Sequence, residues 1–272
     1  MSGSSPQTVA TTRSQLPVKA VIFDIGGVVV GSPFRAIAEF EKQQGLPTNY
    51  INCLITMNGE AGAFQRFERG ECSLSEFYNA WNLEMNDVLR GNSAYQSYCK
   101  RRQLSLPLLP QALSINTREL FSNMMKQSRV EDEKVVQAIH GVRARGLRVI
   151  ALTNNYAKED ASTASSSAEH AELGWEQGAV PSRVRQLFDD WVDSSLEGLR
   201  KPDPRFFELA CKRNRVLPTE CVFLDDIGAN LKAAARLGMR AIHVPLGDST
   251  MALRELEQVL GFDVMSGGQA RL

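Results

Sequence analysis

Four stretches of the sequence place polar side chains at the end of an apolar run or in the loop that follows it. Carboxylate oxygens are ligands that suit a hard divalent cation such as Mg²⁺. A lysine with hydroxyl or amide groups beside such a cation suits a phosphoryl group, whose phosphorus a carboxylate can attack. The alternative is that these are ordinary polar residues of four unrelated surface loops. The residues concerned are Asp24, Thr153, Asn154, Lys201, Asp225 and Asp226.

The first stretch runs from Ala20 to Val30, and in it Asp24 is followed by Gly26 and Gly27. Residues 18–23 are mostly apolar, with β-branched and aromatic side chains, as in a strand buried on both faces. Glycine permits a sharp turn and lets a ligand approach the backbone closely. Taken alone, Asp24 has two interpretations: a reactive carboxylate at a strand end, or a residue that caps a turn.

The elements that must position these residues alternate between strand and helix. This alternation predicts an α/β fold with a mostly parallel, Rossmann-like sheet and helices on both faces. Ligands bind at the carboxyl ends of parallel strands, so the four polar stretches are expected to meet at one edge of the sheet. The strands are predicted at 18–24, 147–152, 191–195, 221–224 and 240–244.

A long helical segment interrupts the alternation, because no convincing strand pattern appears between about residues 33 and 130. Such a length is too great for an ordinary crossover between parallel strands. We therefore predict a helical domain at 33–130, inserted into an α/β core at 17–32 and 131–265; a helical half of a single domain is the alternative. Ser73 and Glu76 form a capping box within the insertion. Its helices are predicted near 34–40, 50–57, 73–89 and 117–125. The other segments are predicted to be a disordered leader at 1–16, a surface loop at 161–178 and a flexible tail at 266–272.

Composition narrows the class of partner. Lysine and arginine number 31, as do aspartate and glutamate, so neither nucleic acid nor an anionic membrane surface is favoured as a partner. No apolar run approaches the length of a membrane span.

The five cysteines are odd in number and never spaced C-x-x-C, which argues against a disulfide framework and a zinc site and favours a reducing compartment such as the cytoplasm. The ending Ala270-Arg271-Leu272 resembles a peroxisomal address, so both locations stay open, as does the oligomeric state.

The four polar stretches resemble, in the same order, the four motifs of the haloacid dehalogenase superfamily of hydrolases. The superfamily's first motif is a strand followed by Asp-x-Asp, and its second ends a strand in Thr or Ser. A lysine marks the third and paired acids the fourth, while the helical insertion resembles the C1 cap. The matching segments are 23–27, 151–155, 201–204 and 223–230. Within the superfamily, residues 222–233 and 253–262 resemble the N-terminal phosphatase domain of soluble epoxide hydrolases, to which a domain of multidomain acyl-CoA dehydrogenases is related.

The resemblance implies a metal-binding role for the acidic residues. Asp24 would be both the nucleophile and a ligand of Mg²⁺. The backbone carbonyl of Gly26 would be a second ligand. Asp226 would hold the cation, and Asp225 would support it.

The resemblance also implies how a phosphoryl group would be bound. Thr153 and Asn154 would bind its oxygens. Lys201 would pair with both Asp24 and the phosphate, and its charge would keep Asp24 ionised at neutral pH. The implied substrate is a small phosphorylated molecule.

Gly26 departs from the family pattern, because related phosphatases usually have a second aspartate at this position. That aspartate protonates the leaving oxygen and then activates water, and such acid–base help is worth roughly 10²–10⁴-fold in rate. Turnover without it would be slow, limited to good leaving groups, or helped by a residue of the cap. Glu60, Glu68 and Glu71 are the candidates, with a solvated surface charge as the alternative for each.

Three functions follow from these observations. The first is a Mg²⁺-dependent phosphatase that acts on a small organic or lipid-like phosphate through an aspartyl phosphate. The second is a dehalogenase-type hydrolase that attacks carbon and needs no metal. The third is a catalytically weak protein that binds a phosphorylated ligand or partner. The Asp225-Asp226 pair favours the first over the second.

Overall fold

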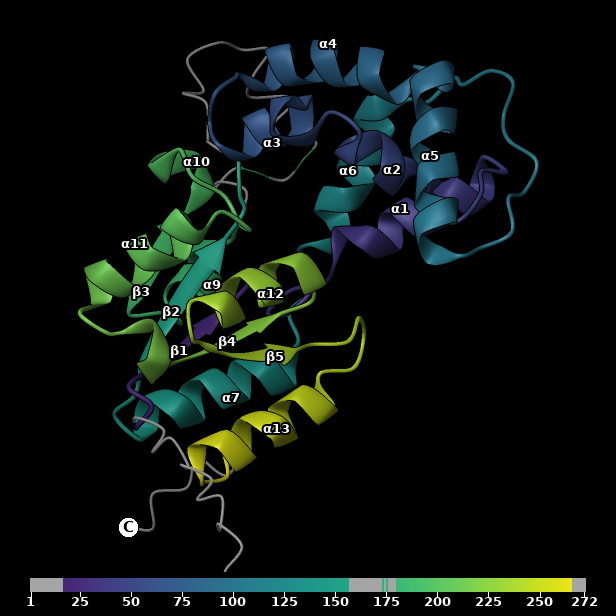
Figure 1. The fold of residues 1–272 in the computed structure, drawn as a ribbon. Coiled ribbons are helices and arrows are strands. Elements are labelled where there is room, and N and C mark those ends of the chain that lie inside the picture. The colour runs from purple at the N-terminus through teal and green to yellow at the C-terminus, as the bar shows by residue number, and fades with distance from the viewer. Residues whose placement is uncertain (1–16, 157–172, 174, 176–179, 266–272) are drawn as a thin grey trace, which may run out of the picture.

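The computed structural model describes residues 17–156, 173, 175 and 180–265 (Figure 1). Its centre is a sheet of five parallel strands in the order β3-β2-β1-β4-β5. The predicted α/β class and each of the five predicted strands are therefore confirmed. The strands are β1 (Ala20–Phe23), β2 (Arg148–Thr153), β3 (Asp190–Asp193), β4 (Cys221–Asp225) and β5 (Arg240–His243).

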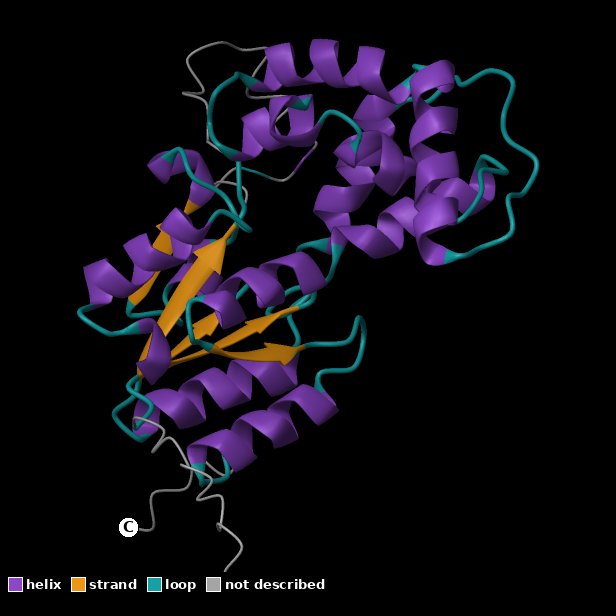
Figure 2. Ribbon diagram, viewed as in Figure 1, coloured by secondary structure: helices purple, strands orange, loops and turns teal. Residues whose placement is uncertain are grey.

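Helices cover both faces of this sheet (Figure 2). On one face, α7 (Glu133–Ala144) and α13 (Thr250–Leu260) pack against each other and against β2 and β5. On the other face, α11 (Pro204–Asn214) contacts β2 and α12 (Gly228–Arg236) contacts β4 and β5. All four residues of β1 are fully buried between these layers, as its apolar sequence predicts.

The chain after β3 differs from the prediction, which continued the strand to residue 195. Asp193 ends the strand and begins the short helix α10 (Ser194–Glu197). The reason is local: an Asp193 side-chain oxygen accepts a hydrogen bond from the backbone N–H of Ser195, at 3.0 Å, and so caps the helix. Another short helix, α9 (Ser182–Arg185), precedes β3.

A helical layer lies beyond the carboxyl ends of the strands, and we call this layer the cap (Figure 1). Its helices are joined by loops and one 3₁₀ turn at Gly59–Ala61, and α1 and α6 pack closely where the chain enters and leaves. The division of the chain at 33 and 130 stays a prediction. The helices of the cap are α1 (Pro33–Gln43), α2 (Tyr50–Thr56), α3 (Ala63–Glu68), α4 (Leu74–Met85), α5 (Val88–Arg102) and α6 (Thr117–Gln127).

Helix α4 begins at the predicted capping box, in which Ser73 Oγ accepts from the N–H of Glu76 at 3.2 Å and the Glu76 carboxylate accepts from the N–H of Ser73 at 2.9 Å. The single helix predicted over 73–89 is wrong at its end, because α4 stops at Met85 and α5 follows. Helix α5 buries only one small or polar-tipped residue per turn (Gly91, Tyr95 and Cys99), so it lacks the apolar periodicity that sequence analysis relies on.

Aromatic side chains fill the interior of the cap. Phe67 and Phe77 stack with their ring centroids 4.4 Å apart. Tyr156, from the loop after β2, stacks on Phe67 and on Trp175 and so ties the core to the cap. Trp175 was predicted within a surface loop, but it is only 2% exposed because it packs into this cluster. Most of that predicted loop, with the predicted leader and tail, lies outside the described residues.

None of the helices that the structure describes combines the length and the hydropathy needed to cross a membrane.

Candidate active site

The carboxyl edge of the sheet and the cap enclose a cavity of about 390 Å³. Asp24, Gly26, Asn154, Lys201 and Asp226 all line it, so the structure brings five of the predicted site residues together. The strand register explains this meeting, because Phe23 of β1 lies beside Ala151 of β2 and Leu224 of β4. The residues that follow on each strand therefore emerge side by side.

Lys201 lies at the centre of the site and is only 1% exposed. Its Nζ is 2.7 Å from Oδ1 of Asp24 and 2.9 Å from Oδ2 of Asp225. Burial works against the charge on this amine, but the two carboxylates outweigh burial, so the pKa of Lys201 is raised and the ammonium form is favoured.

Asn154 holds the segment that carries Lys201. Its Oδ1 accepts a hydrogen bond from the N–H of Lys201 at 2.8 Å, and its Nδ2 donates to the carbonyl of Lys201 at 3.1 Å. Both polar atoms of this side chain are thus engaged with the backbone. Thr153 is buried and its hydroxyl donates to the Asn154 carbonyl at 3.3 Å. Binding of phosphoryl oxygens by these two residues stays a prediction.

Asp24, Asp225 and Asp226 bring their carboxylates together, with one oxygen of each within 4.8 Å of the others. Oδ1 of Asp226 is buried without a hydrogen-bond partner among the described residues, which is costly unless a cation or another donor meets it. Oxygen donors without histidine or thiolate suit a hard cation such as Mg²⁺. The residues present therefore fit such an ion.

Gly27 makes room for this arrangement. Its φ is +84°, and a Cβ built there would lie 2.1 Å from Oδ2 of Asp226. Glycine therefore serves both the left-handed backbone and the close approach of the carboxylate. At Gly26 the nearest heavy atom to such a Cβ is Cδ of Pro33, 3.8 Å away, so that position has space.

Asp225 differs from the other two carboxylates because its oxygens already have protein partners. They accept from Nζ of Lys201, from the N–H of Ile227 at 2.7 Å, and from Nδ2 of Asn230, 3.1 Å from each oxygen. Asp225 is fully buried, whereas Asp226 reaches the cavity. The supporting role of Asp225 at a metal site stays a prediction.

Burial, together with the crowding of negative charge, raises the pKa values of two of the acids. Burial raises the pKa of Asp24 well above its ordinary value, Lys201 opposes that rise, and the two neighbouring carboxylates add to it. Burial and the charge of Asp225 raise the pKa of Asp226 to about 7. A divalent cation at the site would favour the ionised forms of both.

Two supporting residues escaped sequence analysis. Ser32, which caps the start of α1, donates from Oγ to Oδ2 of Asp226 at 3.3 Å. Asn155 donates from Nδ2 to Asp193 at 2.6 Å and from its N–H to Ser194 Oγ at 2.9 Å, so it fixes the loop after β2. The position of Asn155 directly after the Thr-Asn pair was the only available signal.

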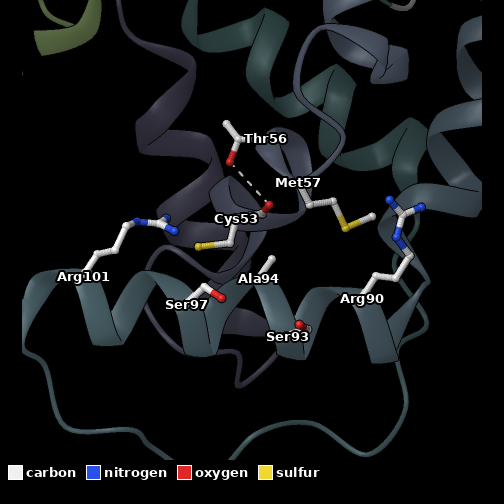
Figure 3. A pocket seen from close by; sticks show the side chains of 8 residues that line it. All are labelled: Cys53, Thr56, Met57, Arg90, Ser93, Ala94, Ser97 and Arg101. Carbon is white, nitrogen blue, oxygen red and sulfur yellow. Dashed lines mark hydrogen bonds between the residues drawn. The ribbon is translucent and has the colours of Figure 1, made fainter.

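A second cavity of about 380 Å³ lies between α2 and α5 (Figure 3). Thr56 lines both cavities, so they lie on either side of α2. The arginines of the second cavity, Arg90 and Arg101, come from α5, and its lining includes none of the acids at the sheet edge. The predicted chemistry therefore belongs to the first cavity.

Comparisons with known proteins agree with this geometry. Over 249 residues the chain is 34% identical to acyl-CoA dehydrogenase family member 10 of Mus musculus, covering 92% of this chain and 20% of the relative. Over 251 residues it is 28% identical to bifunctional epoxide hydrolase 2 of Sus scrofa, covering 92% of this chain and 40% of the relative. The chain thus spans less than half of either relative, and the predicted resemblance to both kinds of protein is confirmed.

A shorter match covers 75 residues at 41% identity with sesquiterpene phosphatase astK of Aspergillus oryzae, which is 28% of this chain and 37% of the relative. The family model of the haloacid dehalogenase-like hydrolases matches residues 18–238. That span contains Asp24 directly after β1, the cap, the loop that carries Lys201, and the acids Asp225 and Asp226 at the end of β4. The chain therefore belongs to the haloacid dehalogenase-like hydrolases.

Proposed function

We propose that this hydrolase is a Mg²⁺-dependent phosphatase that forms an aspartyl phosphate on Asp24. The observation that carries the proposal is the buried pair of Asp24 and Lys201, 2.7 Å apart, beside the three-carboxylate cluster. Asp24, Asp226 and the carbonyl of Gly26 would hold the cation. When bound, Mg²⁺ would neutralise phosphate oxygens and leave the phosphorus open to attack.

The residues of the chain have distinct tasks in this reaction. Asp24 attacks the phosphorus, and the leaving alcohol departs with a proton. Lys201 stays protonated and stabilises the charge on the transferring phosphoryl group. Asp225 holds the Lys201 ammonium in place from its buried position. Water then attacks the aspartyl phosphate, which releases phosphate and restores the carboxylate.

The cavity also favours a class of substrate. Apolar side chains line much of its cap side above the polar floor, as expected for a phosphate ester with an apolar organic group. The Aspergillus relative is named as a phosphatase of a sesquiterpene, which agrees with such a group. The apolar lining residues are Phe34, Ile37, Ile55, Phe64 and Met124.

A carbon-attacking dehalogenase is the second candidate, because such enzymes also lack the second aspartate of the first motif. The unpartnered oxygen of Asp226 argues against it, since a metal-free reaction leaves that buried atom unexplained. The third candidate, a weak relative that binds a phosphorylated ligand, keeps the same site.

A substrate panel with and without Mg²⁺ separates the candidates. We expect Mg²⁺-dependent phosphate release from 4-nitrophenyl phosphate and alkyl phosphates, its loss with EDTA, and its loss in Asp24→Asn. Undiminished turnover by Asp24→Asn would reject the proposal. Halide release from haloacids that EDTA leaves unchanged would support the dehalogenase instead. Binding of phosphate esters without turnover would support the third candidate.

A further inference from the structure

The proposed phosphatase lacks the usual acid–base side chain at Gly26, and among the described residues the atom nearest to a Cβ built there is 3.8 Å away. The alcohol still needs a proton as it leaves, and the attacking water must lose one. A second titratable group in the same cavity could supply both transfers. The cavity contains one such group on its cap side that has little contact with solvent.

That group is Glu68, the last residue of α3, which is 6% exposed and lines the cavity with Asp24 and Lys201. The other two acids considered from the sequence differ from it. The side chain of Glu60 is 67% exposed, and that of Glu71 is 44% exposed and does not line the cavity. The surface-charge interpretation therefore fails for Glu68 alone.

The two oxygens of Glu68 have different surroundings. Oε2 accepts a hydrogen bond from Nε of Arg200 at 2.6 Å. Oε1 has no hydrogen-bond partner among the described residues, so it is available to carry a proton. Arg200 also binds a second acid, because its Nη1 donates to the carboxylate of Glu60 at 3.0 Å.

Contacts with the core fix the position of Glu68 although it belongs to the cap. The hydroxyl of Ser194 donates to the carbonyl of Glu68 at 2.5 Å. Arg200, which holds the carboxylate, directly precedes Lys201 in the chain. The backbone of Glu68 is thus tied to the start of α10, and its side chain to the loop that carries Lys201, which fixes its position as a group in proton transfer requires.

We propose that Glu68 is the general acid and base of this site, in place of the missing aspartate; the inference rests on the proposed phosphatase function. In the first step Asp24 forms a bond to phosphorus, the bond from phosphorus to the ester oxygen breaks, and Glu68 gives its proton to that oxygen. In the second step the Glu68 carboxylate takes a proton from water as the water oxygen bonds to phosphorus. The Asp24–phosphorus bond breaks, so phosphate leaves and both side chains return to their starting forms.

The charges that face Glu68 are consistent with proton exchange. Burial raises its pKa above the ordinary glutamate value, while Arg200 and Lys201 oppose the rise and Glu60 adds to it. Tyr156 also faces it, and burial together with the charge of Glu68 raises the pKa of that phenol, which stays neutral. The carboxyl is therefore neither isolated in an apolar site nor fully committed to one ion pair.

The test compares two esters that differ in how much their leaving group needs a proton. We expect Glu68→Gln to lower kcat/KM for hexyl phosphate about 100-fold, because an alkoxide leaves poorly without an acid. For 4-nitrophenyl phosphate we expect little change in kcat/KM, since nitrophenolate leaves unprotonated. The same variant is expected to show a burst of nitrophenolate, because the second step then lacks its base. Glu71→Gln is the matched control and is expected to behave as wild type.

Rescue provides an independent readout. Gly26→Asp introduces the family's usual acid at a position with space, so in the Glu68→Gln background it is expected to restore hexyl phosphate turnover at least tenfold. Should Glu68→Gln melt below the assay temperature, Glu68→Asp keeps the charge, withdraws the acid by one methylene, and is expected to show the same ester-dependent loss.

Two results would overturn the role of Glu68: equal losses for both esters, or kinetics unchanged in the variant. Either result is distinct from a failure of the phosphatase function itself. If the phosphatase function itself were wrong, the wild-type protein would hydrolyse neither ester, or the Asp24→Asn variant would hydrolyse both.

Discussion

Two parts of the cavity are held in place differently. Its polar floor is the sheet edge, with Asp24, Asn154, Lys201 and Asp226. Its roof is the set of apolar cap side chains that line it, namely Phe34, Ile37, Ile55, Phe64 and Met124. At the floor, specific partners hold Lys201: its ammonium lies between two carboxylates, and both polar atoms of Asn154 bond its backbone. In the roof, side chains such as Ile55 and Phe64 are held by packing alone. Removing one partner from a buried charge is costly, whereas apolar contacts change in small increments. Chemistry should therefore be fragile to single substitutions at the floor, and substrate preference adjustable at the roof.

The largest effect is expected from Lys201→Met. This substitution leaves Asp24 and Asp225 facing each other without the buried cation, which costs about 3–5 kcal/mol of unfolding free energy. Phosphatase activity should fall by about 10³-fold or more, because the phosphoryl charge loses its stabilising partner. Chemical denaturation and steady-state kinetics measure the two effects.

Lys19→Met is the control for this change. Lys19 is 56% exposed on its side chain and pairs with Glu220 at 2.7 Å, so the loss should be below about 1 kcal/mol with activity unchanged. Similar losses of stability in the two variants would contradict the special role of the buried floor.

The next largest effect is expected at Gly27, which lies at the floor, and the adjacent Gly26 serves as its control. Gly27→Ala forces a Cβ onto the Asp226 carboxylate at a backbone with φ of +84°, so we expect weaker Mg²⁺ binding and a loss of about 1–3 kcal/mol of stability. Gly26→Ala meets nothing closer than 3.8 Å and should leave both properties near wild type. Titration calorimetry with Mg²⁺ distinguishes them, and equal affinities in the two variants would be the contrary outcome.

The floor was predictable from the sequence and the roof was not. Asp24 and the paired acids lie at the ends of buried apolar strands, Lys201 lies in a loop further along the chain after β3, and parallel strands bring their carboxyl ends to one edge of the sheet. Phosphate binding by Asn154 stays a prediction, and the structure adds a second task that only the fold reveals, because this side chain is bonded to the Lys201 backbone. The strand pattern predicts where such a polar side chain lies at the sheet edge, but it does not predict which group the side chain bonds.

For the cap, the sequence predicted several helices and a capping box, but not how the helices pack. Helix α5 lacks an apolar stripe, and Trp175 packs into the cap from a distant part of the chain, so neither was visible in local patterns. Glu68 shows the same limit within the site. It could not be told from Glu60 or Glu71 until burial and the contact with Arg200 separated them. Long-range packing decides which of several similar residues reaches a cavity.

A smaller effect is expected in how the stability of the protein depends on pH, with and without Mg²⁺. Because the folded pKa of Asp226 is raised to about 7, against roughly 3.9 in an unfolded chain, the metal-free folded state binds more protons between these values. Stability of the metal-free protein should therefore fall as pH rises through this window. Mg²⁺ competes with the proton, so its stabilising effect should grow with pH.

Melting temperatures with and without Mg²⁺ measure this linkage. At 100 times the dissociation constant the cation should add about 2.7 kcal/mol of stability at pH 8, and less at pH 5.5 at the same concentration. Sodium chloride at equal ionic strength is the control for screening by salt. Equal stabilisation by Mg²⁺ at the two pH values would contradict ionised carboxylates as its ligands.

The smallest expected effect tests the roof. Ile55→Val removes one methylene from the cavity lining, and such a group is worth about 0.8 kcal/mol when buried. KM for octyl phosphate should therefore rise about fourfold, while kcat and the kinetics of phenyl phosphate stay near wild type. Ile51→Val, on the same helix but outside the cavity, is the matched control, since it removes the same group from a fully buried residue.

If the two variants raise KM equally, the change acts through α2 as a whole and not through contact with the substrate. If instead Ile55→Val lowers kcat for both octyl and phenyl phosphate, the apolar roof would take part in the chemical steps. The proposed division, with catalysis at the floor and substrate preference at the roof, would then be wrong.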